Sequence, residues 1–385
     1  MIHLASRISH LAFRIRSRPS PVAPLILAIA LAACGKSQQK VEAPTLAPAN
    51  PVALGKMVQG VQAAHDPSGK GRAIGLLEEA VKADAGLWEA HYNLGILLAD
   101  KGDLGTAERH LATAQQLAPN AEDVAVALSE VRRRRGDAQG AVDALSPFVK
   151  ENPGASYAPV ALIGALRESE KVDEAIAQAQ QVLVRHAKDP RALSELALSY
   201  LDKGELDTAE LLSDEALKAD TKSAIAERTA GLIKLNQGDD AVAFRHFARA
   251  SELDPKDTTA RLNVGTVLLE AGIYDKAAEQ FRATLEAEPD NSSAALGLAA
   301  ARRAQGKRDD QSPYLEAEKL IKGVLEREPE NLDATYNLAV LYADFLKRPG
   351  DAAPLYQRFL DQAPKSHPAH AEAEKAVAAV KNQKK

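Results

Sequence analysis

The chain of 385 residues contains a single cysteine, Cys34. One cysteine excludes a disulfide within the chain and any zinc site built on a cysteine pair. Aromatic residues are also scarce, at 4% of the sequence, so alanine and leucine must supply most of the packing. The apolar run from Pro21 to Ala33 spans only 13 residues. It is therefore shorter than the ~20 residues that a transmembrane helix needs.

The sequence also lacks the motifs that usually mark a catalytic centre. It has no glycine-rich phosphate loop and no His-Glu-x-x-His pattern. The nine histidines are scattered, and neither His91 nor His110 has a neighbour in sequence at metal-ligand spacing. We therefore expect a protein that is not an enzyme, with no catalytic residue, no metal site and no cofactor.

The sequence has no excess of basic residues over acidic residues. The formal net charge is −5, and the first 33 residues contain four arginines and no acidic residue, so the remainder is more acidic still. A mildly acidic body argues against nucleic acid as the main partner.

What the sequence does contain is an internal repeat of 34 residues. Alanine recurs at this step as Ala73, Ala107, Ala141, Ala175, Ala209, Ala243 and Ala277. Prolines keep the same register as Pro119, Pro153, Pro255 and Pro289, and a large apolar side chain follows the alanine by four residues as Leu77, Leu111, Leu145, Phe247 and Phe281. A period of this length, held at several positions, determines the architecture.

Within one repeat the apolar spacing is helical. In residues 88–121, leucines at three- and four-residue steps mark one helical face, and Gly102-Asp103 then turns the chain. The second half is again helix-spaced, and Pro119 ends it because proline cannot continue a helix. Each repeat is thus predicted to be a helical hairpin. One hairpin cannot bury its apolar faces alone, so successive hairpins must stack.

This pattern resembles the tetratricopeptide repeat family. The family's small residue, alanine, bulky residue and closing proline correspond to Gly95, Ala107, Leu111 and Pro119. They recur as Gly231, Ala243, Phe247 and Pro255, and again as Gly265, Ala277, Phe281 and Pro289. The resemblance implies an all-α superhelical solenoid of about nine hairpins over residues 54–366. We place the repeats at 54–87, 88–121, 122–155, 156–189, 190–223, 224–257, 258–291, 292–331 and 332–366.

The last repeats depart from the period. Six extra residues fall around Gly306 to Pro313, where the polar sequence predicts a loop. The ninth repeat has one extra residue, which we place near Arg348-Pro349-Gly350. Residues 367–385 are rich in alanine and charge, and we expect a C-terminal capping helix that frays into the final lysines.

The N-terminus is typical of a secretory signal, since a basic stretch precedes a short apolar segment over residues 1–33. Leu31-Ala32-Ala33-Cys34 resembles a bacterial lipobox, which implies lipidation of Cys34. The long stretch before the apolar segment is unusual and leaves open a start codon downstream of Met1. Residues 34–53, with three prolines, should form a flexible linker. By the same resemblance, Gly35 instead of aspartate after the cysteine implies the outer membrane, with the protein facing the periplasm.

The family resemblance also implies a partner-binding groove. In the family, the first helices of successive repeats line the concave face, at the second, fifth, sixth, ninth and twelfth places of each repeat. The groove residues predicted in this way are Tyr92, Asn93, Ile96, Arg133, Tyr157, Arg167, Arg228, Leu232, Asn263, Thr266, Tyr336 and Asn337. Their mixture of apolar, aromatic and arginine side chains suits an extended segment or an amphipathic helix. Several of them could equally pack against neighbouring helices.

Two other features of this face limit the hypotheses. Some relatives hold a C-terminal carboxylate with a lysine-asparagine clamp, but Tyr92 stands where the first lysine would be. The third repeat has a run of four arginines, Arg132 to Arg135. We interpret this run as charge that complements a helix C-terminus, in preference to a basic patch for a carboxylate or phosphate.

Together these features predict a non-catalytic scaffold, held at the membrane by a lipid anchor, that binds other envelope proteins or peptides. It would assemble or stabilise a motility, pilus or secretion machine. The layout looks like that of the gliding-motility repeat lipoproteins of myxobacteria, and less like the shorter pilus-assembly pilotins. The alternative is a regulator or substrate-capture factor for cell-wall or polysaccharide-export enzymes.

Overall fold

The computed structural model describes residues 49–307 and 309–383. The predicted signal segment, Cys34 and the linker up to residue 48 lie outside these residues. Within them, every regular element is a helix. The helices form nine hairpins followed by one more helix, so the predicted all-α fold of nine helical hairpins with a C-terminal cap helix is confirmed.

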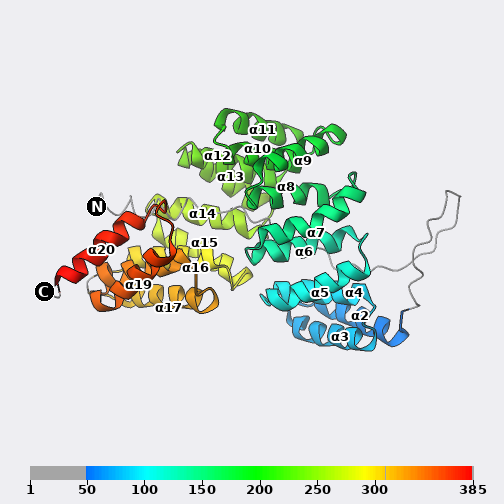
Figure 1. Cartoon of the computed structure of the whole chain (residues 1–385), viewed down its shortest axis with the longest axis horizontal. Coiled ribbons are helices and arrows are strands. Elements are labelled where there is room, and N and C mark those ends of the chain that lie inside the picture. The colour runs from blue at the N-terminus through cyan, green and yellow to red at the C-terminus, as the bar shows by residue number, and fades with distance from the viewer. Residues whose placement is uncertain (1–48, 308, 384–385) are drawn as a thin grey trace. The chain divides into compact units, whose positions relative to one another are not determined.

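The described residues fall into two compact units, divided between Thr221 and Lys222. The first unit contains five hairpins: α2 (Pro51–Ala64) with α3 (Lys70–Ala83), α4 (Trp88–Asp100) with α5 (Leu104–Leu117), α6 (Glu122–Arg134) with α7 (Ala138–Glu151), α8 (Ala158–Glu168) with α9 (Val172–Arg185), and α10 (Pro190–Asp202) with α11 (Leu206–Ala219). A short 3₁₀ turn, η1 (Pro67–Gly69), joins α2 to α3. Figure 1 shows the helices following one another in pairs along the chain.

The second unit contains four hairpins and a final helix. Its elements are α12 (Ala224–Asn236) with α13 (Asp240–Leu253), α14 (Thr258–Glu270) with α15 (Tyr274–Ala287), α16 (Ser292–Gln305) with α17 (Ser312–Arg327), α18 (Leu332–Val340) and η2 (Leu341–Phe345) with α19 (Pro349–Gln362), and α20 (His370–Gln383). Ala369, Ala373 and Val377 of the α20 region join the same apolar cluster as Phe359 of α19. The last helix therefore covers the end of the ninth hairpin.

The first helix begins earlier than the sequence predicted. We placed the boundary between linker and repeats at residue 54, but α2 starts at Pro51. The Asn50 side chain accepts a hydrogen bond from the Val52 N–H at 2.9 Å, and its own N–H donates to Asp84 at 2.9 Å. The N-cap of Asn50, together with its contact with Asp84 in the turn after α3, fixes the start of α2 three residues before the predicted boundary.

The repeated small residues permit the close approach of the paired helices. Each alanine of the 34-residue series has no exposed surface. Gly231 of α12 lies under the ring of Phe247 from α13, where an added Cβ would come within 2.5 Å of the ring. Gly95 has the same relation to Leu111, at 2.6 Å. The glycine and the bulky residue of each pair are thus required together, because the ring or the leucine side chain occupies the space that a side chain at the glycine position would need.

The turns inside the hairpins follow the same register. Gly102, Gly136, Gly204, Gly238 and Gly272 all have positive φ, between 75° and 90°. One repeat breaks the series, since Glu170 adopts φ 64° at the place where the other repeats have glycine. The turn geometry is therefore imposed by the hairpin and not by glycine alone.

We expect Gly204→Ala and Gly75→Ala to change stability in opposite directions. Gly204 has φ 79°, where a Cβ is strained, so alanine should lower the free energy of unfolding by about 1 kcal/mol. Gly75 lies within α3 with open space around its Cα, so alanine should raise that free energy by up to about 1 kcal/mol. Urea denaturation of both variants measures the difference, and a shift of the same sign in both would contradict the assignment of the Gly204 turn.

The six extra residues of the eighth repeat do not all loop out as expected. A regular hairpin such as α4–α5 has helices of 13 and 14 residues, whereas α16 has 14 and α17 has 16. Half of the insertion therefore lengthens the two helices, and only the remainder enlarges the turn. Tyr314 of α17 packs onto the backbone of Gly306, which holds the longer helix against the turn.

The extra residue of the ninth repeat is also placed differently from the prediction. It is absorbed inside the first helix as the π-helical segment η2, in which the Leu346 N–H donates to the Leu341 carbonyl at 2.9 Å, and not in the turn near Pro349. The bulge lets Phe345 reach Tyr314, with ring centroids 5.4 Å apart. The Tyr342 hydroxyl donates to Glu318 of α17 at 2.8 Å. The two irregular repeats are thus joined by aromatic contacts.

Candidate partner-binding surface

The groove residues predicted in α4 are mostly buried. Tyr92 and Asn93 have 1% or less of their surface exposed, and Ile96 packs at the edge of the core. The Asn93 amide donates to the Glu89 carbonyl of the same helix at 2.8 Å, and its Oδ1 has no hydrogen-bond partner. Burial, together with the negative charge of Asp123, raises the pKa of Tyr92, whose hydroxyl also has no partner. These side chains line the first-helix side of the hairpin but offer little accessible surface.

The two predicted groove arginines of the first unit are held by carboxylates. Arg133 of α6 donates from Nε and Nη2 to the two oxygens of Glu168, at 2.8 and 2.5 Å. Arg167 of α8 donates from Nη1 to Asp202 at 3.0 Å, and its Nε lies 3.5 Å from Glu195 Oε2. Burial opposes the charged form of both arginines, but the surrounding carboxylates outweigh it and raise the pKa of both. The sequence predicted these arginines as partner-binding residues, and the structure places them in contacts between repeats.

The same arginine–carboxylate contact occurs between two successive pairs of hairpins. Glu168 lies 35 residues after Arg133, at the end of the first helix of the next hairpin. Asp202 has the same relation to Arg167. The carboxylates were missed in the sequence analysis, although a signal was present. Acidic residues occupy the thirteenth place of six repeats, as Asp66, Asp100, Glu168, Asp202, Glu270 and Asp344.

The four consecutive arginines are all engaged within the protein. Arg132 donates to Glu108 at 2.9 Å and to the Gly140 carbonyl at 2.8 Å. Arg134 donates to the Ala99 carbonyl at 3.0 Å, and Arg135 pairs with the other oxygen of Glu108. With Arg133 on Glu168, each arginine bridges α6 to a neighbouring helix. Arg132 to Arg134 lie in the last turn of α6, as expected for charge at a helix C-terminus, but the contacts of the run are ion pairs and carbonyl hydrogen bonds to other helices.

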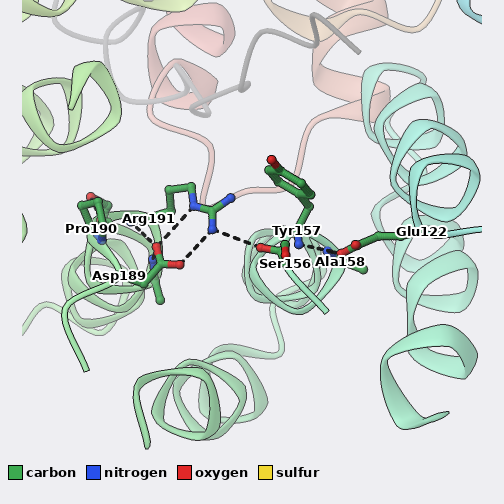
Figure 2. Close-up of polar contacts among 9 residues, drawn as sticks. Glu122, Ser156, Tyr157, Ala158, Asp189, Pro190 and Arg191 are labelled. Atoms are coloured by element: carbon green, nitrogen blue, oxygen red, sulfur yellow. Dashed lines mark hydrogen bonds and ion pairs between the residues drawn. The ribbon is translucent and has the colours of Figure 1, made fainter. Parts of the chain in front are cut away.

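Tyr157 is the predicted groove residue that remains accessible, with 57% of its surface exposed. It precedes α8, and Figure 2 shows its ring beside the Arg191 guanidinium, whose Cζ lies 5.1 Å from the ring centroid. Arg191 Nη2 donates to the Ser156 carbonyl at 3.0 Å and to Asp189 at 2.9 Å. The guanidinium therefore supports the tyrosine from the next hairpin by a cation–π contact.

Glu122 fixes the start of α8 from the preceding hairpin. Its Oε1 accepts hydrogen bonds from the backbone N–H groups of Tyr157 and Ala158, at 2.6 and 2.7 Å (Figure 2). The helix has no side-chain cap of its own, so this carboxylate satisfies two of its first donors. The first helices of three successive hairpins, α6, α8 and α10, thus lie side by side at an edge, and the Tyr157 ring projects from this edge into solvent.

In the second unit the predicted groove residues have structural contacts. Arg228 of α12 forms a buried ion pair with Asp257, the N-cap of α14. The Thr266 hydroxyl donates to the Leu262 carbonyl at 3.1 Å, and Leu232 packs at the edge of an apolar cluster. Asn263 is 1% exposed, and neither atom of its amide has a hydrogen-bond partner.

The C-terminal members of the predicted groove contact the capping helix. The Tyr336 ring packs against Tyr356 and Phe359 of α19, with centroids 5.9 and 5.2 Å apart. Its hydroxyl donates to Glu372 of α20 at 3.0 Å. The neighbouring Asn337 is half-buried. Tyr336 therefore helps to hold the last helix in place.

His91 and His110 are adjacent in space despite their separation in sequence. His91 lies on α4 and His110 on α5, and their Nδ1 atoms are 3.0 Å apart. One ring must donate its proton and the other must accept it. The equivalent positions of the sixth repeat form the Glu227–His246 contact at 2.7 Å, and those of the fifth repeat are Leu193 and Leu212. No group of three or more potential metal ligands gathers anywhere in the described residues.

We expect the stability of the first unit to fall below about pH 6.5 because of this pair. Burial lowers the pKa of both imidazoles from 6.5, and for His110 the positive charges of His91 and Arg109 add to the effect. The folded state thus favours the neutral rings. The stability that the neutral histidine pair contributes is present above pH 6.5, the pKa of histidine in the unfolded chain. It is lost as pH falls through the lower pKa values of the two rings in the folded state. Denaturation midpoints across pH 5–8 measure the loss, and the H91L/H110L variant should lack this part of the pH dependence.

Comparison with known proteins defines the class. The sequence matches the tetratricopeptide repeat family over residues 69–122, 160–224, 228–291, 265–311 and 308–367, which together exceed half of the chain. The chain therefore belongs to the tetratricopeptide repeat family. Its fold supports a protein–protein interaction scaffold, and proteins of this class bind peptides or proteins in a groove.

Comparison with solved structures finds other helical repeat assemblies, and one of these aligns with a TM-score above 0.5. A chain of the APC/C hetero-tetramer Cut9–Hcn1 aligns with a TM-score of 0.57 and 14% identity, over 86% of this chain and 62% of its own length. A tetratricopeptide repeat protein from Parabacteroides merdae aligns with a TM-score of 0.45 and 17% identity, over 67% and 98%. YrrB, a repeat protein with an unusual peptide-binding site, gives a TM-score of 0.35 and 20% identity, over 50% and 96%. No curated protein matches the sequence.

None of the helices in the described part of the chain combines the length and apolar character required to cross a bilayer.

Proposed function

We propose that this tetratricopeptide repeat protein is a non-catalytic scaffold tethered to the bacterial outer membrane through a lipidated Cys34, on the periplasmic side. The observation that carries the proposal is the position of Cys34. It directly follows Leu31-Ala32-Ala33 at the end of the apolar segment, and it is the chain's single cysteine. Stable anchoring by acyl chains requires more than one chain, and a lipobox cysteine receives several in the proteins that it resembles.

The scaffold would hold a segment of another envelope protein against the first helices of the repeats. Support comes from the family and from the edge formed by α6, α8 and α10, where Tyr157 projects into solvent beside Arg191. An exposed aromatic ring supported by a guanidinium provides an anchoring contact for an extended segment or an amphipathic helix. The assembly served would be a motility, pilus or secretion machine of the envelope.

Palmitate labelling and membrane fractionation test the anchor. In cells, the wild-type chain should incorporate labelled palmitate and sediment with the outer membrane, and globomycin should cause the precursor to accumulate. Cys34→Ala should abolish labelling and release the protein from the outer membrane. A Cys34→Ala protein that still sediments with that membrane would contradict lipid anchoring.

A pull-down tests the scaffold. The wild-type chain, recovered from detergent-solubilised envelopes, should bring down at least one envelope protein in a defined ratio. Tyr157→Ala should reduce that recovery, whereas Val184→Ala, which removes an 86% exposed side chain from the second helix α9, should not. Recovery of no partner from wild type would contradict the scaffold proposal.

A further inference from the structure

The last helix, α20, follows the register of a first helix in a further repeat. Its buried region contains Ala369, Ala373 and Val377, which lie 35 residues after the third, seventh and eleventh places of the ninth repeat. Figure 1 shows α20 beside α19, and these three residues share an apolar cluster with Phe359 of α19. On the ninth hairpin, α20 thus takes the place that a first helix takes on each earlier hairpin.

The buried side chains of α20 are smaller than those of most earlier first helices. The seventh place is leucine in six of the nine repeats, as Leu94, Leu128, Leu162, Leu196, Leu298 and Leu338. In α20 this place is Ala373, and the eleventh place is Val377 where α18 has Tyr342. A smaller side chain buries less apolar surface, so α20 is held more weakly than a helix with leucine at these places would be.

The large ring beneath α20 does not by itself require the alanine. Phe359 is fully buried and lies in the same apolar cluster as Ala373. In the third repeat Phe148 occupies the place equivalent to Phe359, and the next first helix packs Leu162 into the same cluster as Phe148. A hairpin with phenylalanine at this place therefore accepts a first helix that carries leucine.

The packing of α20 is one-sided. On the side of the ninth hairpin, Glu372 accepts a hydrogen bond from the Tyr336 hydroxyl at 3.0 Å. Earlier first helices also pack against their own second helix, as Gly95 does against Leu111 at the eighth place. In α20 the eighth place is Glu374, whose side chain is 63% exposed, and no second helix covers it in the described part of the chain. We therefore expect α20 to open more readily than the first helices before it.

From this weaker packing we propose that α20 is an exchangeable cover, and that the face of the ninth hairpin beneath it binds an amphipathic helix of a partner protein. The fitting helix has alanine, leucine and leucine at successive four-residue steps, as Ala90, Leu94 and Leu98 of α4 do. These residues lie on one side of a helix and bury more apolar surface than those of α20. Because α20 is tethered to the same chain, its effective concentration is on the order of millimolar, so only a better-packed helix displaces it.

A labelled peptide tests the exchange with the full chain in a non-ionic detergent. The peptide has the sequence of residues 367–383 with Ala373→Leu and Val377→Leu, so that it carries the fitting pattern. Fluorescence anisotropy should show that it binds the wild-type chain at least about tenfold more tightly than the unsubstituted peptide does, because the two leucines bury more apolar surface.

Two variants of the chain separate exchange from non-specific binding. A373L/V377L in the chain strengthens the packing of α20 itself and should weaken binding of the labelled peptide by about tenfold or more. The matched control, A371L/A378L, adds two leucines at exposed places of the same helix and should bind the peptide as wild type does. Circular dichroism checks that both variants remain folded.

Hydrogen exchange identifies the segment that the peptide displaces. Addition of the peptide to the wild-type chain should lower amide protection in α20, whereas α18 and α19 should keep theirs. No binding to the wild-type chain, equal binding to the wild-type and A373L/V377L chains, or unchanged protection of α20 in the complex would overturn the inference. The face beneath α20 lies in the second unit and does not include Tyr157, so these outcomes are independent of the tests of the proposed function.

Discussion

Replacement of Phe247 by alanine is expected to lower the free energy of unfolding by about 3–5 kcal/mol. The ring has no exposed surface and lies against Gly231, which has no side chain that could fill the cavity left behind. The loss should therefore combine the transfer free energy of the ring with the cost of an unfilled cavity.

Hydrogen exchange shows where this loss occurs. Amide protection should fall in α12 and α13, whereas α4 and α5 of the first unit should keep their protection. Leu211→Ala, which removes a 60% exposed side chain, serves as the control and should change stability by less than about 0.5 kcal/mol. A Phe247→Ala protein within about 1 kcal/mol of wild type would contradict the packing of the bulky residue on the glycine.

Arg133→Met is expected to be as damaging, at about 3–5 kcal/mol, for a different reason. The substitution keeps the apolar length of the side chain but removes both hydrogen bonds to Glu168, whose side chain is 9% exposed. A buried carboxylate then loses the two hydrogen bonds that Arg133 donates to it. R133M/E168M should recover part of the loss, because that carboxylate is also removed.

Arg135→Met is the matched control for this prediction. It lies in the same run of arginines, but its side chain is 47% exposed, so the loss of its ion pair with Glu108 should cost no more than about 1 kcal/mol. Chemical denaturation of the three variants gives the comparison. Equal effects of R133M and R135M would show that Arg133 does not hold the repeats together.

The fold could be predicted from the sequence because one constraint recurs along the chain. A small residue, a bulky residue and a turn recur in register in several hairpins, and each has the same physical role wherever it recurs, as Gly231 with Phe247 and Gly95 with Leu111 show. The exceptions could not be predicted in detail. An extra residue can enlarge a turn or form a π-helical bulge at similar cost, and the choice of η2 depends on contacts such as that of Phe345 with Tyr314.

The candidate site was harder to predict than the fold. The repeat register identified which places belong to the first helices, but it does not show which side chains another repeat already engages. The sequence predicts Arg133 and Arg167 as partner-binding residues, but in the structure both are held by carboxylates 35 residues further along the chain. Tyr157 remains exposed because Glu122 and Arg191, from the hairpins on either side, fix its surroundings. Such contacts between repeats depend on side-chain geometry that periodicity alone does not supply.

Site-specific photo-crosslinking in cells tests the central claim most directly. A photoreactive amino acid at position 157 places the probe on the first-helix edge, and one at position 184 places it on the second helix α9, where Val184 is more exposed than Tyr157. We expect a discrete crosslinked protein from position 157 and none from position 184. The absence of any crosslink at 157, or the same products from both positions, would contradict a partner-binding surface on the first helices.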